Sequence, residues 1–109
     1  MIRHIVLFSA KRPENVDRIV ETLSGYAAIP GVVSLTVSRN LRLDPTSTEI
    51  DVVLEATFGS IEDLEAYKRH PIYRRGTSIV RPLRELRFVA DTEIGARGSA
   101  AVAREAIDA

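Results

Sequence analysis

Four side chains carry most of the chemistry that this sequence could perform. His4 lies near the start of the chain, and Tyr67, His70 and Tyr73 lie close together further along. A histidine can accept or donate a proton near neutral pH, because its ordinary pKa is about 6.5. A tyrosine combines an apolar ring with a hydroxyl that can orient a phenol, a quinone or a carboxylate. These residue types predict either acid/base chemistry or the binding of a small molecule.

Each histidine also has a purely structural interpretation. His4 alternates with Val6 and Phe8, so its ring falls among apolar neighbours, as a hydrogen-bonded core histidine would. His70 precedes Pro71, where a helix is expected to break, and its side chain could bond to the backbone there. The alternative places His70 at the mouth of a pocket that also contains His4.

Composition and charge exclude several other kinds of site. The chain has 109 residues, no cysteine and two histidines, and it carries 15 Lys+Arg against 15 Asp+Glu. Without cysteine there is no disulfide scaffold, and no metal-ligand spacing or Gly-rich phosphate loop is visible, so we expect no metal and no cofactor. The sequence also lacks an apolar run of ~18 residues and a signal peptide. We therefore expect a soluble cytoplasmic protein with no membrane partner.

A basic stretch occupies the second half of the chain. Its members are Lys68, Arg69, Arg74, Arg75, Arg81, Arg84 and Arg87. A net charge of zero and the lack of a recognised motif argue against a nucleic-acid partner. We expect instead a solvated helix face, ion-paired to the acidic residues Glu62, Asp63 and Glu65. One arginine could also attract an anionic ligand to the mouth of a pocket.

The spacing of apolar residues predicts the elements that must position these groups. Alternation predicts strands, and recurrence every three to four residues predicts helices. The expected order is a strand at 2–9, a helix at 13–27, strands at 32–43 and 49–58, a helix opened by Ser60, interrupted at His70 and resumed over 71–80, and a strand from about 86 to 91. The order β-α-β-β-α-β is the ferredoxin-like, α+β arrangement, in which helices cover one face of the sheet. Residues 1–93 form the predicted domain, and 94–109 form a tail that is either a short helix or disordered.

The other face of the sheet is expected to mix apolar and polar side chains. Its expected members are Ile5, Leu7, Val32, Ser34, Thr36, Val53, Thr57 and Val89, whereas Val33, Leu35, Val37, Leu41 and Leu43 are assigned to the core. Such a face is too apolar for a fully solvated surface and too polar for a dry core. We therefore expect a homodimer in which two sheets face each other. A monomer with one half-exposed face is the alternative.

Four segments of the chain resemble the stress-responsive A/B barrel (Dabb) domain family. They are IRHIVLF, IPGVVSLTVSRN, DVVLEATFGSIEDLEAYKRHP and VRPLRELRFVADTE, in the order and at the spacing of the family. The resemblance covers about residues 1–93 and implies a dimeric α+β barrel. This implication agrees with the fold class that the periodicity predicts.

The resemblance also implies candidate site residues. The family includes a cofactor-free polyketide cyclase that uses acid/base chemistry in a pocket between helix and sheet. His4 matches its first-strand histidine, Tyr67 matches its tyrosine before the HP dipeptide, and His70 belongs to that HP pair. Tyr73 stands where the cyclase has another histidine.

The resemblance thus implies a homodimer that binds a small hydrophobic or aromatic molecule in a pocket lined by His4, Tyr67, His70 and Tyr73. A cyclase-like or isomerase-like enzyme that uses His4 and Tyr67 is one alternative, and a purely structural oligomer is another. The sequence leaves open whether the protein is catalytic.

Overall fold

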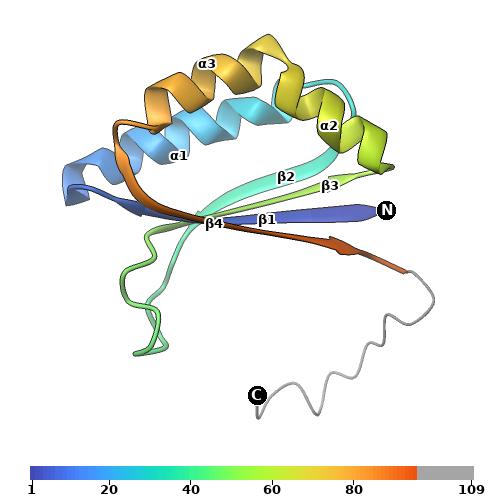
Figure 1. Cartoon of the computed structure of the whole chain (residues 1–109). Helices are drawn as coiled ribbons and strands as arrows, with labels where there is room; N and C mark the ends of the chain where they lie inside the picture. The colour runs from blue at the N-terminus through green and yellow to red at the C-terminus, as the bar shows by residue number, and fades with distance from the viewer. Residues whose placement is uncertain (96–109) are drawn as a thin grey trace.

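A four-stranded sheet with helices on one face forms the fold (Figure 1). The computed structural model describes residues 1–95. Its strands are β1 (Ile2–Ala10), β2 (Val32–Arg39), β3 (Val52–Phe58) and β4 (Arg84–Glu93). Its helices are α1 (Val16–Ser24), α2 (Ile61–Arg69) and α3 (Pro71–Val80), and the 3-10 turns η1 (Pro13–Asn15) and η2 (Gly25–Ala28) flank α1. Residues 96–109 of the predicted tail lie outside the described residues.

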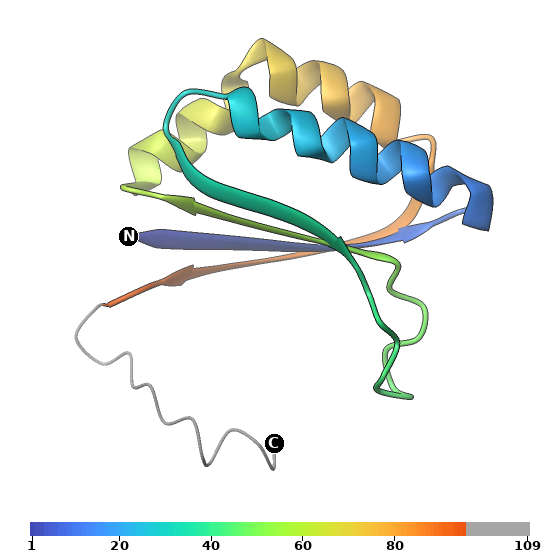
Figure 2. The ribbon, with the colours of Figure 1, turned by 180° about the vertical axis from the view of Figure 1, so that it is seen from behind.

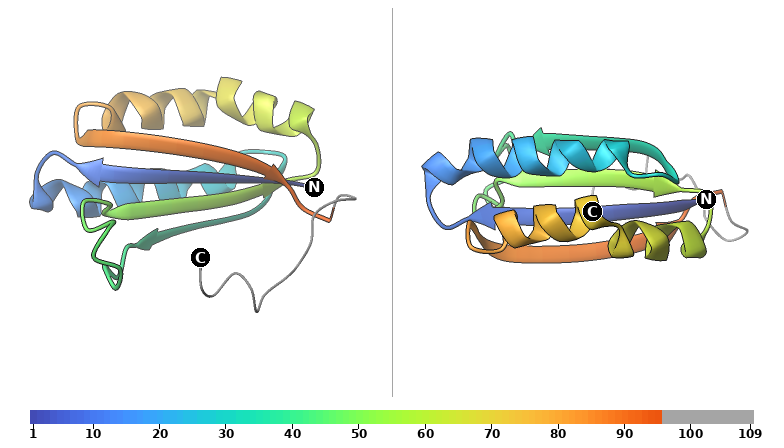
Figure 3. Two further views of the ribbon diagram at one scale, coloured as in Figure 1. Left: turned by 60° about the horizontal axis from the view of Figure 1, so that its bottom comes forward. Right: turned by 90° about the horizontal axis from the view of Figure 1, so that it is seen from above.

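The strands lie in the order β2-β3-β1-β4, and each neighbouring pair is antiparallel. This topology confirms the predicted α+β, ferredoxin-like fold. Seen from above, α1 lies over the β2–β3 half of the sheet, and α2 and α3 lie over the β1–β4 half (Figure 3). Within residues 1–95, the opposite face of the sheet carries no helix (Figure 2). The apolar core therefore lies between the sheet and the helices.

The interruption between α2 and α3 follows the sequence prediction. The Ser60 hydroxyl accepts a hydrogen bond from the backbone nitrogen of Asp63 at 3.1 Å and caps the start of α2. His70 then has extended backbone dihedrals, because proline at position 71 disfavours a helical conformation for the preceding residue. Pro71 occupies the first turn of α3, where its missing N–H costs no hydrogen bond.

The expected alternation of strand β2 was wrong at both of its ends. The register against β3 shifts between Val32 and Ser34, so a bulge places Val32 on the core side and leaves Val33 58% exposed. The strand also ends at Arg39, and Leu41 and Leu43 lie in the following loop with 79% and 85% of their surface exposed. Alternation alone does not reveal a bulge or the end of a ladder.

In strand β4, Val89 does not lie on the open face of the sheet, where the sequence predicts it. Val89 pairs with Val6 in the ladder between β1 and β4, so both side chains are on the helical side of the sheet. Phe88 pairs with Leu7 and therefore lies on the open face, with 55% of its surface exposed. The open face thus carries the larger of the two side chains.

No helix of residues 1–95 is long and apolar enough to cross a membrane.

Candidate functional site

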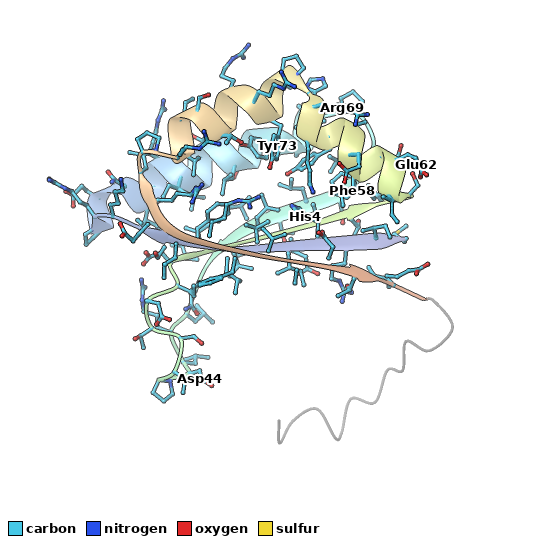
Figure 4. The ribbon with its side chains drawn as sticks, in the orientation of Figure 1. His4, Asp44, Phe58, Glu62, Arg69 and Tyr73 are labelled. Atoms are coloured by element: carbon cyan, nitrogen blue, oxygen red, sulfur yellow. The ribbon has the colours of Figure 1, made fainter. Side chains whose placement is uncertain are left out.

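Strand β1 places His4 in the middle of the core. Its neighbours on the same strand face, Val6 and Phe8, are also buried, and His4 itself is 1% exposed. The edge of the His4 ring meets Phe58 at a centroid distance of 6.4 Å and Tyr67 at 6.1 Å. His4 and Phe58 lie at the sheet, below the helical layer that carries Tyr73 (Figure 4). The imidazole is therefore surrounded by aromatic rings.

Among residues 1–95, His4 has one polar partner, the carboxylate of Asp91 on β4. The two residues are directly opposed in the β1–β4 ladder, and His4 Nδ1 lies 2.6 Å from Asp91 Oδ1. A carboxylate accepts hydrogen bonds, so the hydrogen of the neutral imidazole is on Nδ1 and Nε2 is left as an acceptor. Burial lowers the pKa of His4, and the bond to Asp91 only partly opposes this effect. His4 is therefore a neutral base at neutral pH.

Tyr67 of α2 is the centre of an aromatic cluster. Its ring centroid lies 4.9 Å from that of Phe58, 5.1 Å from that of Tyr73 and 5.9 Å from that of Tyr26. The side chain is 1% exposed, and its hydroxyl has no hydrogen-bond partner among the described residues. Burial, with a contribution from the two other tyrosines, raises the pKa of Tyr67. The phenol therefore stays protonated and can donate a hydrogen bond.

These side chains surround a cavity of about 210 Å³ between the sheet and the helices. His4, Tyr67 and Tyr73 all line it, so the structure brings together three of the four residues chosen from the sequence. The remaining lining residues are Val6, Phe8, Leu23, Tyr26, Leu54, Thr77, Val80, Arg81, Arg84 and Arg87. The lining is thus aromatic and aliphatic inside, with several cationic groups.

His70 has a different position from the one expected in the pocket. It does not line the cavity, and its Nδ1 accepts a hydrogen bond from the backbone nitrogen of Ile72 at 3.1 Å. The ring thereby satisfies one of the free N–H groups at the start of α3. The structure therefore gives His70 the backbone-bonding role that was the alternative to a pocket role.

Three further polar side chains belong to the site but are not among the residues predicted for it. They are Asp91, which bonds to His4, and Tyr26 and Thr77, which line the cavity. Tyr26 belongs to the buried core, and it also lines the cavity and donates a hydrogen bond to the carbonyl of Tyr73 at 3.1 Å. Its ring fits because residue 76 is glycine: a Cβ there would lie 2.3 Å from Tyr26 Cε1. Thr77, which lies 3.4 Å from the Tyr26 hydroxyl, was also missed. Their helical spacing gives no sign of a cavity.

The basic stretch divides into two parts in the structure. Within residues 1–95, its one ion pair joins Lys68 to Glu65 at 3.9 Å, so the expected pairing with the acidic turn is limited to that contact. Arg81, Arg84 and Arg87 instead line the cavity. This second part places positive charge beside the aromatic cluster.

A family model described as the stress-responsive A/B barrel domain, Dabb, matches residues 2–94. The chain belongs to this family. No curated protein matches the chain. The match spans the whole sheet and all three helices, so the Dabb domain includes the cavity and every residue that lines it.

Solved structures share the fold of this Dabb domain. A dimeric ferredoxin-like protein of unknown function from Thermobifida fusca is 27% identical with a TM-score of 0.74, over 85% of this chain and 90% of that one. A Dabb family protein from Mesorhizobium loti is 21% identical with a TM-score of 0.74, over 87% and 97% of the two chains. SnoaB, a cofactor-independent oxygenase from Streptomyces nogalater, is 14% identical with a TM-score of 0.66, over 88% and 94%. The last two likenesses show the fold alone.

The site of the Dabb domain contains no cluster of acidic and histidine side chains that suits a metal ion. Within residues 1–95, no group of three or more His, Cys, Asp or Glu side chains is placed to hold one. The polar groups around the cavity are a neutral imidazole, phenol hydroxyls, the Thr77 hydroxyl and guanidinium groups. These groups can accept a proton, donate hydrogen bonds and attract an anion.

Proposed function

We propose that this Dabb domain protein binds a small hydrophobic or aromatic molecule in the cavity between its helices and its sheet. The hydroxyl of Tyr67 carries this proposal, because it is buried without a partner among the described residues and belongs to a side chain that lines the cavity. A buried hydroxyl without a hydrogen bond costs about 1–3 kcal/mol. A bound molecule with an acceptor oxygen would remove this cost, while the surrounding rings would cover its apolar part.

Replacing Tyr67 with phenylalanine tests this proposal. The free protein is expected to be as stable as the wild type or more stable, because the variant removes a hydroxyl that lacks a partner. The affinity for 2-naphthamide, a neutral aromatic probe with a carbonyl oxygen, is expected to fall by roughly 3–10-fold, the loss of one hydrogen bond. Denaturant unfolding measures the stability, and probe fluorescence measures the affinity.

Tyr26→Phe is the matched control, because Tyr26 also lines the cavity but its hydroxyl already bonds to the carbonyl of Tyr73. This variant is expected to lose about 1 kcal/mol of stability and to keep its affinity for the probe. Two results contradict the proposal: a wild-type protein that binds neither 2-naphthamide nor its carboxylate analogue 2-naphthoate at millimolar concentration, or a Tyr67→Phe variant that binds 2-naphthamide as tightly as the wild type.

We also propose that the protein is a homodimer joined through the open face of the sheet. On this face Leu7, Val53 and Phe88 lie side by side in adjacent strands. No helix in the described part of the chain, residues 1–95, covers this face (Figure 2). Two sheets that pack face to face would remove this apolar row from water. The Thermobifida fusca relative is described as dimeric, which supports a homodimer.

The extent of the domain and the location of the protein are part of the same proposal. Residues 1–93 form the Dabb domain, which is supported by the family match to residues 2–94. The protein acts in the cytoplasm, and its lack of cysteine suits a reducing compartment. Its ligand therefore belongs to the small molecules of the cell interior.

Acid/base catalysis without a cofactor is the second candidate function. It is favoured by the 2.6 Å contact between His4 and Asp91, which leaves His4 Nε2 as an acceptor beside the cavity. A base in this position could take a proton from a C–H group next to a carbonyl. The hydroxyl of Tyr67 could donate a hydrogen bond to the enolate oxygen that forms.

Deuterium exchange into phenylacetone tests this second function. The wild-type protein in D2O is expected to accelerate exchange at the methylene group, as measured by NMR, and His4→Gln is expected to lower that rate by 10²-fold or more, the usual contribution of a positioned base. His70→Gln is the control, since His70 caps a helix outside the cavity. Equal rates for the wild type and His4→Gln contradict catalysis and leave the binding function in place.

A further inference from the structure

The cavity has an excess of positive charge among its lining residues. Arg81, Arg84 and Arg87 line it, and no aspartate or glutamate among residues 1–95 does. Within residues 1–95, none of these three guanidinium groups forms an ion pair with a carboxylate. Arg87 reaches the rim of the aromatic cluster, since its Nη2 lies 3.5 Å from the hydroxyl of Tyr73. Cationic and aromatic groups therefore share one cavity wall.

A change of register in the sheet places two of these arginines on the same face. In β4, Arg84 and Arg87 are three residues apart, and regular alternation would point their side chains to opposite faces. The ladder with β1, however, pairs Arg87 with Phe8 and Arg84 with Ala10, so three residue steps of β4 match two steps of β1. Both arginines consequently face the helical side, and both line the cavity.

A buried hydroxyl holds this irregular segment of β4. Ser9, which is 5% exposed, lies between Phe8 and Ala10, and its Oγ accepts a hydrogen bond from the backbone nitrogen of Leu86 at 2.9 Å. This bond satisfies an N–H group that the bulge removes from the regular ladder. The position of Arg84 is thus fixed by the fold and does not depend on a flexible loop.

The arginine arrangement is electrostatically unfavourable while the cavity contains no anion. Arg84 is half-buried, and burial together with the positive charges of Arg87 and Arg81 lowers its pKa. The positively charged guanidinium groups repel one another, and a carboxylate bound between them would attract each of them and offset this repulsion. Arginine suits this purpose, because its planar guanidinium group presents paired donors to the two oxygens of a carboxylate.

We propose that the molecule bound in the cavity is an aromatic carboxylate, with its ring against Tyr67 and Tyr73 and its carboxylate on Arg84 and Arg87. This inference rests on the proposed binding function and adds the chemical class of the ligand. The apolar interior of the cavity selects the ring, and the cationic rim selects the charge. A neutral aromatic molecule of the same size would satisfy only the first of these two requirements.

A matched pair of probes tests this inference on the full-length protein. 2-Naphthoate and 2-naphthamide have the same ring system and differ in the charge of one substituent. The wild type is expected to bind 2-naphthoate at least 10-fold more tightly than 2-naphthamide at low ionic strength, and this preference is expected to shrink as salt is added. Arg84→Gln and Arg87→Gln are each expected to weaken 2-naphthoate binding by roughly 10-fold and to leave 2-naphthamide binding unchanged.

Arg75→Gln is the control, because Arg75 is an exposed residue of α3 that does not line the cavity, and the change removes the same charge. It is expected to leave the affinity for both probes unchanged. Equal affinity of the wild type for the two probes overturns the inference and leaves the binding function intact. Equal losses of 2-naphthoate affinity in Arg75→Gln and Arg84→Gln also overturn it, because they indicate attraction by net charge alone. If neither probe binds, the binding function fails and the inference fails with it.

Discussion

Replacing Phe58 with alanine is expected to lower the free energy of unfolding by about 3–5 kcal/mol. Phe58 is completely buried at the end of β3, and its ring packs against Tyr67 at 4.9 Å and against His4 at 6.4 Å. The substitution removes the apolar contacts of the Phe58 ring. It also leaves an empty space beneath Tyr67 and His4, next to the existing cavity. A domain of this size has a total stability of about 5–15 kcal/mol, so the loss is a large fraction of the whole. Denaturant unfolding followed by circular dichroism measures it.

The control for this variant is Ile61→Ala, which truncates an apolar side chain that is 61% exposed on α2. Its stability is expected to change by less than about 0.5 kcal/mol. If Phe58→Ala destabilises the protein no more than Ile61→Ala does, the packing of Phe58 beneath Tyr67 is not the contact that supports the site.

Replacing Phe88 with glutamate is expected to convert the dimer into a monomer at micromolar concentration. Phe88 is 55% exposed in the single chain and lies on the open face beside Leu7. In a two-fold dimer, each copy would bring one glutamate to the interface, and an unpaired charge there costs several kcal/mol. The dissociation constant is therefore expected to rise by on the order of 100-fold or more. Sedimentation equilibrium or light scattering measures the mass.

Ile61→Glu provides the comparison, because it also introduces a carboxylate at an exposed apolar position but does so in the helical layer. This variant is expected to remain a dimer. A wild-type protein that is a monomer at micromolar concentration contradicts the dimer outright. A dimer that survives Phe88→Glu and dissociates with Ile61→Glu shows that the helices form the interface instead.

The two faces of one sheet therefore have separate roles in these proposals. The helical side carries His4, Tyr67 and the arginines around the cavity, and the open side carries Phe88. Strand β1 contributes to both faces, because alternate side chains of a strand point to opposite sides: His4 lies on the helical face and Leu7 on the open face. Variants of one face can consequently be tested with little effect on the other.

Periodicity in the sequence predicted the fold correctly where the signals are local. Ser60 at the start of α2 and Pro71 at the start of α3 act on the backbone within a few residues, so their effects can be predicted from the chain itself. The same kind of reasoning assigned Val33 to the core and Val89 to the open face, and both assignments were wrong. They depend on bulges and register, which are properties of two strands together.

The sequence by itself determined the α+β fold and placed His4 among apolar strand neighbours, because alternation and helical spacing are visible along one chain. Its resemblance to the Dabb family implied that Tyr67 and Tyr73 share a pocket with His4. Only the tertiary structure paired His4 with Asp91, which is 87 residues away, since that contact requires the register of β1 against β4. The same register turns Arg84 and Arg87 to one face and gives the cavity its charge. Patterns along one chain do not show which residues pair between strands, and these pairings decide the chemistry of the site.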